Sequence, residues 1–67
     1  MLENAVKQRR QAHGLTQSEL GEKVRVTRQT IAFIEKGDFS PSIALSLRLA
    51  AALSTPINEL FWLTEEK

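Results

Sequence analysis

The sequence predicts an all-α domain built from five short helices. The first observation is helical spacing of apolar residues, as in Leu20 and Val24 or Ile31 and Ile34. The second is that a helix-capping residue precedes such a stretch and a glycine follows it. The third is length, because 67 residues make one domain, residues 1 to 67, the expected count.

The composition narrows the function before any motif is considered. The chain has no Cys and one His, so we expect no disulfide and no zinc site. It also lacks a Gly-rich phosphate loop, a His–carboxylate arrangement and a carboxylate cluster in an apolar setting. We therefore expect no enzyme, no catalytic residue, no metal and no cofactor. The longest apolar run is too short to cross a bilayer, and the N-terminus has no signal-peptide core, so a cytoplasmic location without a membrane partner is expected.

The first helix is expected to run from Leu2 to the residue before Gly14. Val6 and the aliphatic stem of Arg9 or Arg10 continue the apolar stripe that Leu2 begins. Gly14 is placed to end the helix, because glycine adopts the left-handed conformation of a helix C-cap without strain.

The second helix is expected to start at Thr16. Its hydroxyl can cap the helix, and Glu19, three residues later, completes a capping box. Leu20 and Val24 then supply one apolar stripe. Gly21 lies inside this helix, where it lowers helix propensity. We attribute it to a close approach by the next helix, because two helices that cross steeply need a small residue at the crossing.

A two-residue break that begins at Arg25 separates the second helix from the third. Thr27 is placed to cap the third helix, and Gly37 to end it. Ile31 and Ile34 form its buried stripe. Two short helices joined this tightly predict a helix-turn-helix.

The other face of the third helix carries Arg28, Gln29, Ala32 and Phe33. Arg and Gln near a helix N-terminus suit bidentate recognition of base edges in a DNA major groove. The alternative is a solvated polar face on a small helical domain, which an Arg-Gln pair taken alone would favour.

The fourth helix is expected to begin after Ser42 as its cap and to end near Leu53. It is apolar nearly all round, with only Ser46 and Arg48 as interruptions, and such a helix is normally buried on more than one side. The side expected to face the domain's own core holds Ile43, Leu47, Ala50 and Leu53. Another side, left for a partner, holds Leu45, Leu49 and Ala52.

A last short helix is expected with Thr55 as its cap and Pro56 in its first turn. The residues expected to pack inward are Ile57, Leu60 and Phe61. Trp62 and Leu63 follow directly, and two interpretations stay open for them. They either close the core of the monomer or form a contact between subunits.

Charge is distributed unevenly along the chain, although the net charge is only +1. Residues 1 to 30 hold six basic and three acidic residues, a net charge of +3. Residues 31 to 67 hold three basic and five acidic residues, a net charge of −2. A positive field on the half that carries the helix-turn-helix favours a polyanionic partner.

The run LTQSELGEKVRVTRQTIAFIEKG resembles the Xre family of helix-turn-helix regulators, which includes the lambda and 434 phage repressors. The resemblance extends from about residue 4 to residue 61 and includes QRRQAHGLTQ before the motif and PSIALSLRLAAALSTPINELF after it. The matching residues are Leu15, Thr16, Gln17, Leu20, Thr27, Arg28, Gln29, Thr30, Ile31, Ile34, Glu35 and Gly37. The resemblance implies a compact five-helix lambda-repressor-like DNA-binding domain with the helix-turn-helix at helices 2 and 3.

The resemblance also implies roles for single residues. Those expected to read or border bases are Thr27, Arg28, Gln29 and Phe33, with Arg28 preferring G, Gln29 preferring A, and Phe33 placed against a thymine methyl. Those expected to contact phosphate are Arg10, Thr30, Lys36 and, through its backbone N–H, Gln17.

The same resemblance implies one ion pair, and the sequence differs from the family pattern at two positions. Arg10 and Glu35 match an Arg–Glu pair of these repressors, so we expect them to tie the first helix to the third. Arg25 stands where the family has a left-handed Gly, at a cost of roughly 1 kcal/mol. Asp38 stands where the family often has a basic residue, so Lys36 is expected to take over that phosphate contact.

The expected function is a sequence-specific regulator of transcription, acting as a repressor on double-stranded DNA. It is expected to read a palindromic operator through the major groove as a homodimer. Residues 43 to 63 are expected to form the dimer, with Leu45, Leu49, Ala52, Trp62 and Leu63 at the interface. The alternative class is a protein-interaction module, such as an antitoxin that also binds a toxin; restriction–modification controllers have this size as well.

Overall fold

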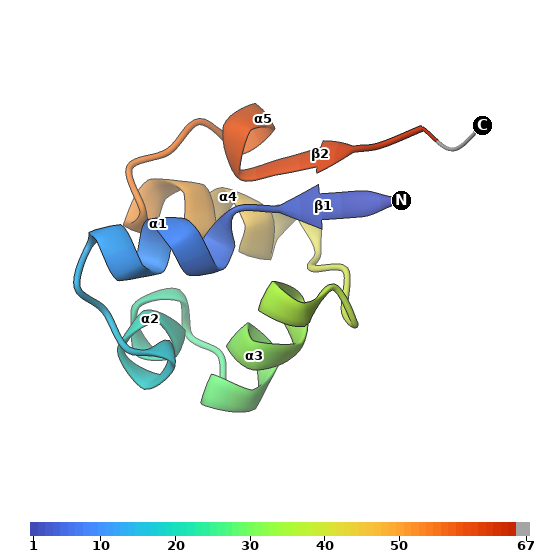
Figure 1. Ribbon diagram of the computed structural model, residues 1–67. Coiled ribbons are helices and arrows are strands. Elements are labelled where there is room, and N and C mark those ends of the chain that lie inside the picture. Colours follow the sequence, from blue (N-terminus) through green and yellow to red (C-terminus); the bar gives the residue numbers. More distant parts are fainter. Residues whose placement is uncertain (66–67) are drawn as a thin grey trace.

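Five helices and two short strands make up the chain in a computed structural model, which describes residues 1–65 (Figure 1). In chain order they are β1 (Leu2–Asn4), α1 (Val6–Ala12), α2 (Gln17–Val24), α3 (Arg28–Lys36), α4 (Ile43–Ala52), α5 (Ile57–Leu60) and β2 (Phe61–Leu63). The predicted five-helix class, with the helix-turn-helix at the second and third helices, is confirmed. The two strands are an addition that the sequence pattern did not predict.

The strands join the two ends of the chain as an antiparallel ribbon (Figure 1). Leu2 pairs with Leu63, and the backbone bonds continue to Thr64, whose N–H donates to the Met1 carbonyl at 2.8 Å. The expectation that the first helix begins at Leu2 is therefore wrong. The physical reason is a partner distant in sequence, because β2 satisfies the backbone groups of β1 that a helix would have satisfied locally.

The core consists of nine buried side chains that come from all five helices and from the residue that ends α4. They are Val6, Leu20, Val24, Ile31, Ile34, Leu45, Leu49, Leu53 and Leu60. Phe61 is half-buried against this core, whereas Ile57, expected to pack inward, is exposed. All five helices therefore share one core, and α3 depends on it for its position.

The side of α4 that faces the core is only partly the predicted one, because Leu53 is buried and Ala50 packs against the core as expected, but Ile43 and Leu47 do not. Leu45 and Leu49 are 5% and 0% exposed, whereas Ile43 and Leu47 are 76% and 53% exposed. The expectation that Leu45 and Leu49 lie on a free side is wrong. A helix that is apolar nearly all round has no strong periodicity to fix its rotation, so its neighbours decide it. Arg48 of α4 bonds to α2 in this rotation, because its Nε donates to the Val24 carbonyl at 3.1 Å.

Helix caps are mostly as predicted. Thr16 forms its capping box with Glu19, with N···O distances of 2.8 and 3.0 Å, and Ser42 accepts a bond from the Leu45 N–H at 3.1 Å. The expectation for α5 is wrong, because Pro56 occupies the N-cap and Thr55 makes no cap. The Thr55 hydroxyl instead donates to the Leu53 carbonyl at 2.9 Å, which satisfies a group at the end of α4.

The turn between α2 and α3 brings the two helices into close contact. Arg25 adopts the left-handed conformation, with φ 68° and ψ 41°, as its place in the turn implies. The Val26 N–H then donates to the Gly21 carbonyl at 2.9 Å. A Cβ at Gly21 would lie 2.7 Å from the Val26 carbonyl oxygen and 3.3 Å from Thr27, so glycine is required by the backbone that leads into α3.

Candidate nucleic-acid interface

The outward face of α3 begins at its first turn, where Arg28 and Gln29 are exposed. Ile31 and Ile34, on the inner side of the helix, are 0% and 1% exposed. Phe33 lies one turn beyond Gln29 and is 47% exposed. The structure thus presents three of the predicted base-reading side chains on the free side of one short helix, and their role in reading bases remains a prediction.

Thr27 and Thr30 form the cap of α3. The Thr27 hydroxyl oxygen accepts a hydrogen bond from the Thr30 backbone N–H at 3.2 Å and lies 3.1 Å from the Thr30 hydroxyl. These bonds satisfy a donor that the first turn of a helix leaves open. The first structural task of both threonines is therefore to start α3 where Arg28 can be presented, and their predicted DNA contacts are still untested.

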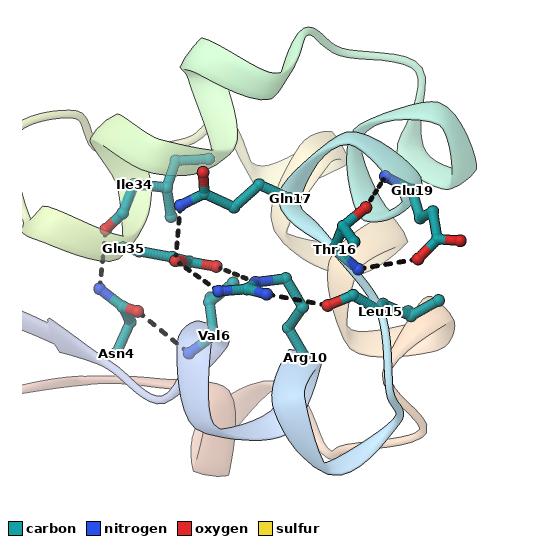
Figure 2. A network of polar contacts seen from close by, with 9 residues as sticks. All are labelled: Asn4, Val6, Arg10, Leu15, Thr16, Gln17, Glu19, Ile34 and Glu35. Atoms are coloured by element: carbon teal, nitrogen blue, oxygen red, sulfur yellow. Dashed lines mark hydrogen bonds and ion pairs between the residues drawn. The ribbon is translucent and has the colours of Figure 1, made fainter.

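A buried ion pair fixes α3 against α1 (Figure 2). The Nε of Arg10 lies 2.7 Å from Oε2 of Glu35, and Nη2 lies 3.3 Å from Oε1. The third Arg10 contact is a bond from Nη1 to the Leu15 carbonyl at 2.8 Å. The two side chains are only 11% and 4% exposed, so removal of one partner would leave the other as a buried, unpaired charge, which is costly. The predicted Arg10–Glu35 pair is confirmed.

Gln17 joins the same network from the first turn of α2 (Figure 2). Its side-chain Nε2 donates to Oε1 of Glu35 at 3.1 Å, so Glu35 accepts bonds from both α1 and α2. The backbone N–H groups in the first turn of a helix have no partner within the helix and attract anions. The Gln17 side chain therefore bonds to α3 through Glu35, and its backbone N–H is the group predicted to contact phosphate.

Asn4 is a structural residue that the sequence analysis missed. Its side-chain Nδ2 donates to the Ile34 carbonyl at 2.9 Å, and its Oδ1 accepts from the Val6 N–H at 3.0 Å (Figure 2). One amide thus satisfies the start of α1 and the end of α3. An Asn two residues before an apolar helical stretch was the available signal, since Asn often bonds to nearby backbone N–H groups.

Lys36 and Asp38 lie at the far end of α3. Their charged groups are 4.0 Å apart, and the side chains are 67% and 61% exposed. An exposed pair at this distance contributes little, so Lys36 can exchange Asp38 for a phosphate at small cost. Arg10 is placed differently, because its guanidinium is already engaged in the core. Both predicted phosphate contacts remain predictions.

The residues predicted for a dimer interface do not lie on one surface. Leu45 and Leu49 are in the core, and Ala52 is half-buried beside it. Trp62 and Leu63, on β2, are 41% and 77% exposed. Two of the five residues are thus unavailable to a partner, and the large apolar residues that α4 does expose are others, Ile43 and Leu47.

Two further observations bear on the class of the site. Residues 1–65 contain no group of three His, Cys, Asp or Glu side chains that could hold a metal ion. Within the same residues, none of the helices has the length and apolarity needed to cross a membrane. The candidate site in the described residues is therefore the exposed start of α3, together with the hydrogen bonds of Arg10, Gln17 and Asn4 that hold α3 in place.

Comparison with known proteins identifies this arrangement. A helix-turn-helix family model matches residues 6–60. The chain is 49% identical over 65 residues to the uncharacterized HTH-type transcriptional regulator YgzD of Bacillus subtilis (strain 168), covering 97% of this chain and 98% of the relative. It is 48% identical over 62 residues to an uncharacterized HTH-type transcriptional regulator of Methanothermobacter thermautotrophicus, covering 91% and 90%. A similar regulator of Archaeoglobus fulgidus is 39% identical over 62 residues, covering 92% and 89%. The chain therefore belongs to the Xre-like helix-turn-helix family of DNA-binding transcriptional regulators.

Proposed function

We propose that the protein is a repressor that occupies a palindromic operator as a homodimer, with α3 of each copy in the major groove. The observation that carries this proposal is the exposed Arg28 and Gln29 at the start of a helix whose opposite side is fully buried. Arg pairs with G and Gln with A through two hydrogen bonds each, and such pairs distinguish base pairs in the major groove.

The braces behind α3 support the same proposal. Recognition of base edges requires that a side chain be held in a fixed position relative to the phosphates. Glu35 is bonded to both Arg10 and Gln17, and Asn4 bonds the last turn of α3. α3 is thereby linked to α1, to α2 and to the start of the chain. A helix of nine residues held at so many points is suited to present Arg28 in one orientation.

The regulators named above are similar over nearly their whole length, which supports a role in transcription. Repression is the simplest such role, because an operator-bound protein only has to exclude polymerase. A two-fold dimer follows from the size of the site, since one short recognition helix reads only a few base pairs. Two helices related by a two-fold axis read half-sites about 34 Å apart. Such a protein acts where the chromosome is, so we place it in the cytoplasm.

Selection of bound sequences from random duplex DNA tests the proposal. The expected product is an inverted repeat whose half-sites are about 10 base pairs apart, with affinity that falls steeply as salt rises. A footprint should cover both half-sites, and transcription from a promoter that overlaps the site should fall as protein is added. Recovery of no consensus, or of one half-site alone, would refute the proposed binding mode. A rise in transcription would identify an activator.

A further inference from the structure

The outward side of α4 is an apolar stripe that residues 1–65 leave in water. Ile43 and Leu47 are 76% and 53% exposed, and Ala51 is exposed as well. The three residues are four apart in sequence, so they lie in one row along the helix. Ala44, also exposed, widens the row without adding a polar group. A continuous apolar row of this kind on a small domain marks a contact surface.

We infer that a second copy of the chain covers this stripe, in an antiparallel α4–α4 contact centred on Leu47. The inference rests on the proposed homodimer and names the face that forms it. In a two-fold contact, residue i meets residue j and j meets i. With the axis at Leu47, Ile43 of each copy meets Ala51 of the other. A large side chain thus lies against a small one at both ends, and the row is complementary to itself.

Two basic residues lie beside the stripe on one side. Lys23 and Arg48 border a shallow hollow on the α2 side, together with Ala51 and Ala52. Arg48 is held there by its bond to the Val24 carbonyl. Figure 1 shows α2 and α3 on the same side of α4, and Lys23 and Val24 belong to α2. In the proposed dimer we place the flank with Lys23 and Arg48 on the side of the DNA in both copies. The four cations then face phosphates, which offset their mutual repulsion.

The β1–β2 ribbon is the competing surface, because Trp62 and Leu63 are exposed on it. They are consecutive residues of one strand, so their side chains point to opposite faces of the ribbon. A single partner surface cannot cover both. The α4 row, by contrast, lies on one side of one helix, which one partner helix can bury completely.

Cysteine cross-linking of the full chain on its selected duplex DNA tests the register. The chain has no cysteine, so each introduced thiol is unique. Helices in contact have axes roughly 8–10 Å apart, which brings facing Cα atoms to roughly 4–5 Å, within reach of a disulfide. Two copies of residue 43 would instead be about 12 Å apart along the helices, out of reach.

The expected result is that Leu47→Cys oxidises to a linked homodimer at least about tenfold faster than Leu63→Cys, the matched exposed leucine on β2. Ile43→Cys and Ala51→Cys should each stay unlinked alone and link when mixed. Faster linking of Leu63→Cys, self-linking of Ile43→Cys, or no linking at any of these positions would overturn the inference. If the unmodified chain selects an inverted repeat in each of these cases, the proposed function stands and only the α4 contact fails. If it selects none, the proposed function itself fails.

Discussion

Removal of the Glu35 carboxylate should greatly destabilise the protein, although Glu35 is not one of the apolar core residues. In Glu35→Ala, Arg10 would keep its charge in a site where its side chain is 11% exposed, with the Leu15 carbonyl left as its partner. The Gln17 amide would lose its acceptor as well. Breaking one side of a buried ion pair costs about 3–5 kcal/mol.

That loss is large for a chain of this length. A domain of 67 residues has a total unfolding free energy of about 3–10 kcal/mol. Glu35→Ala is therefore expected to lose a large part of its unfolding free energy at 25 °C, and urea denaturation followed by circular dichroism measures the difference. The comparison variant is Arg10→Met with Glu35→Leu, which removes both charges and keeps an apolar filling. Replacement of both partners is often neutral or stabilising, so this double variant should recover most of the loss.

The exposed pair Lys36–Asp38 supplies the matched control. Its charged groups are 4.0 Å apart and its side chains are 67% and 61% exposed, so Lys36→Ala should change stability by less than about 0.5 kcal/mol. The reasoning would be refuted if Glu35→Ala lost less than about 1 kcal/mol, or if the double variant were no more stable than Glu35→Ala.

Three further predictions concern recognition and the turn. Arg28→Ala should weaken binding of the selected duplex by about 1–3 kcal/mol and relax the preference at one base pair, whereas Lys36→Ala should weaken binding to all sequences alike. Repeating the selection with each variant tests this, and an unchanged consensus for Arg28→Ala would contradict it. Gly21→Ala should destabilise the fold by about 1–3 kcal/mol, because the added Cβ would lie 2.7 Å from the Val26 carbonyl oxygen. An unchanged unfolding free energy in urea denaturation would show instead that the turn backbone moves to accommodate the methyl group. Arg25→Gly should stabilise by about 1 kcal/mol, because φ is 68° at this residue, and a drop in melting temperature would mean that the Arg25 side chain has a stabilising contact.

Much of the site could be predicted because its signals are local in sequence. Thr16 with Glu19 and the lone Thr27 cap helices through residues three positions away, so their spacing is visible in the chain itself. Gly21 indicated a close approach at this point of α2, but the neighbouring backbone is that of Val26 and Thr27 in the turn rather than that of the next helix. The Arg10–Glu35 pair spans 25 residues and could be named only through the resemblance to a known family.

The remainder depended on partners that the sequence does not place. Asn4 was read as part of a helix, yet its amide bonds a carbonyl 30 residues away. Thr55 was read as a cap, yet its hydroxyl turns back to Leu53. In each case the polar group could bond to several backbone groups, near or distant in sequence, and the packed structure selects the partner.

The sequence by itself determined the helix-turn-helix, its caps and the residues that α3 presents, because periodicity, capping and glycine act over one or two turns. Only the tertiary structure decided the rotation of α4 and the conformation of the chain ends. A helix apolar on every side is compatible with several rotations, and packing against α2 and α5 buried Leu45 and left Leu47 in water. Leu2 became a strand residue because Leu63, 61 residues away, supplies its backbone partner. Local pattern fixes where helices form, whereas contacts between distant segments fix which side of each helix remains for a partner.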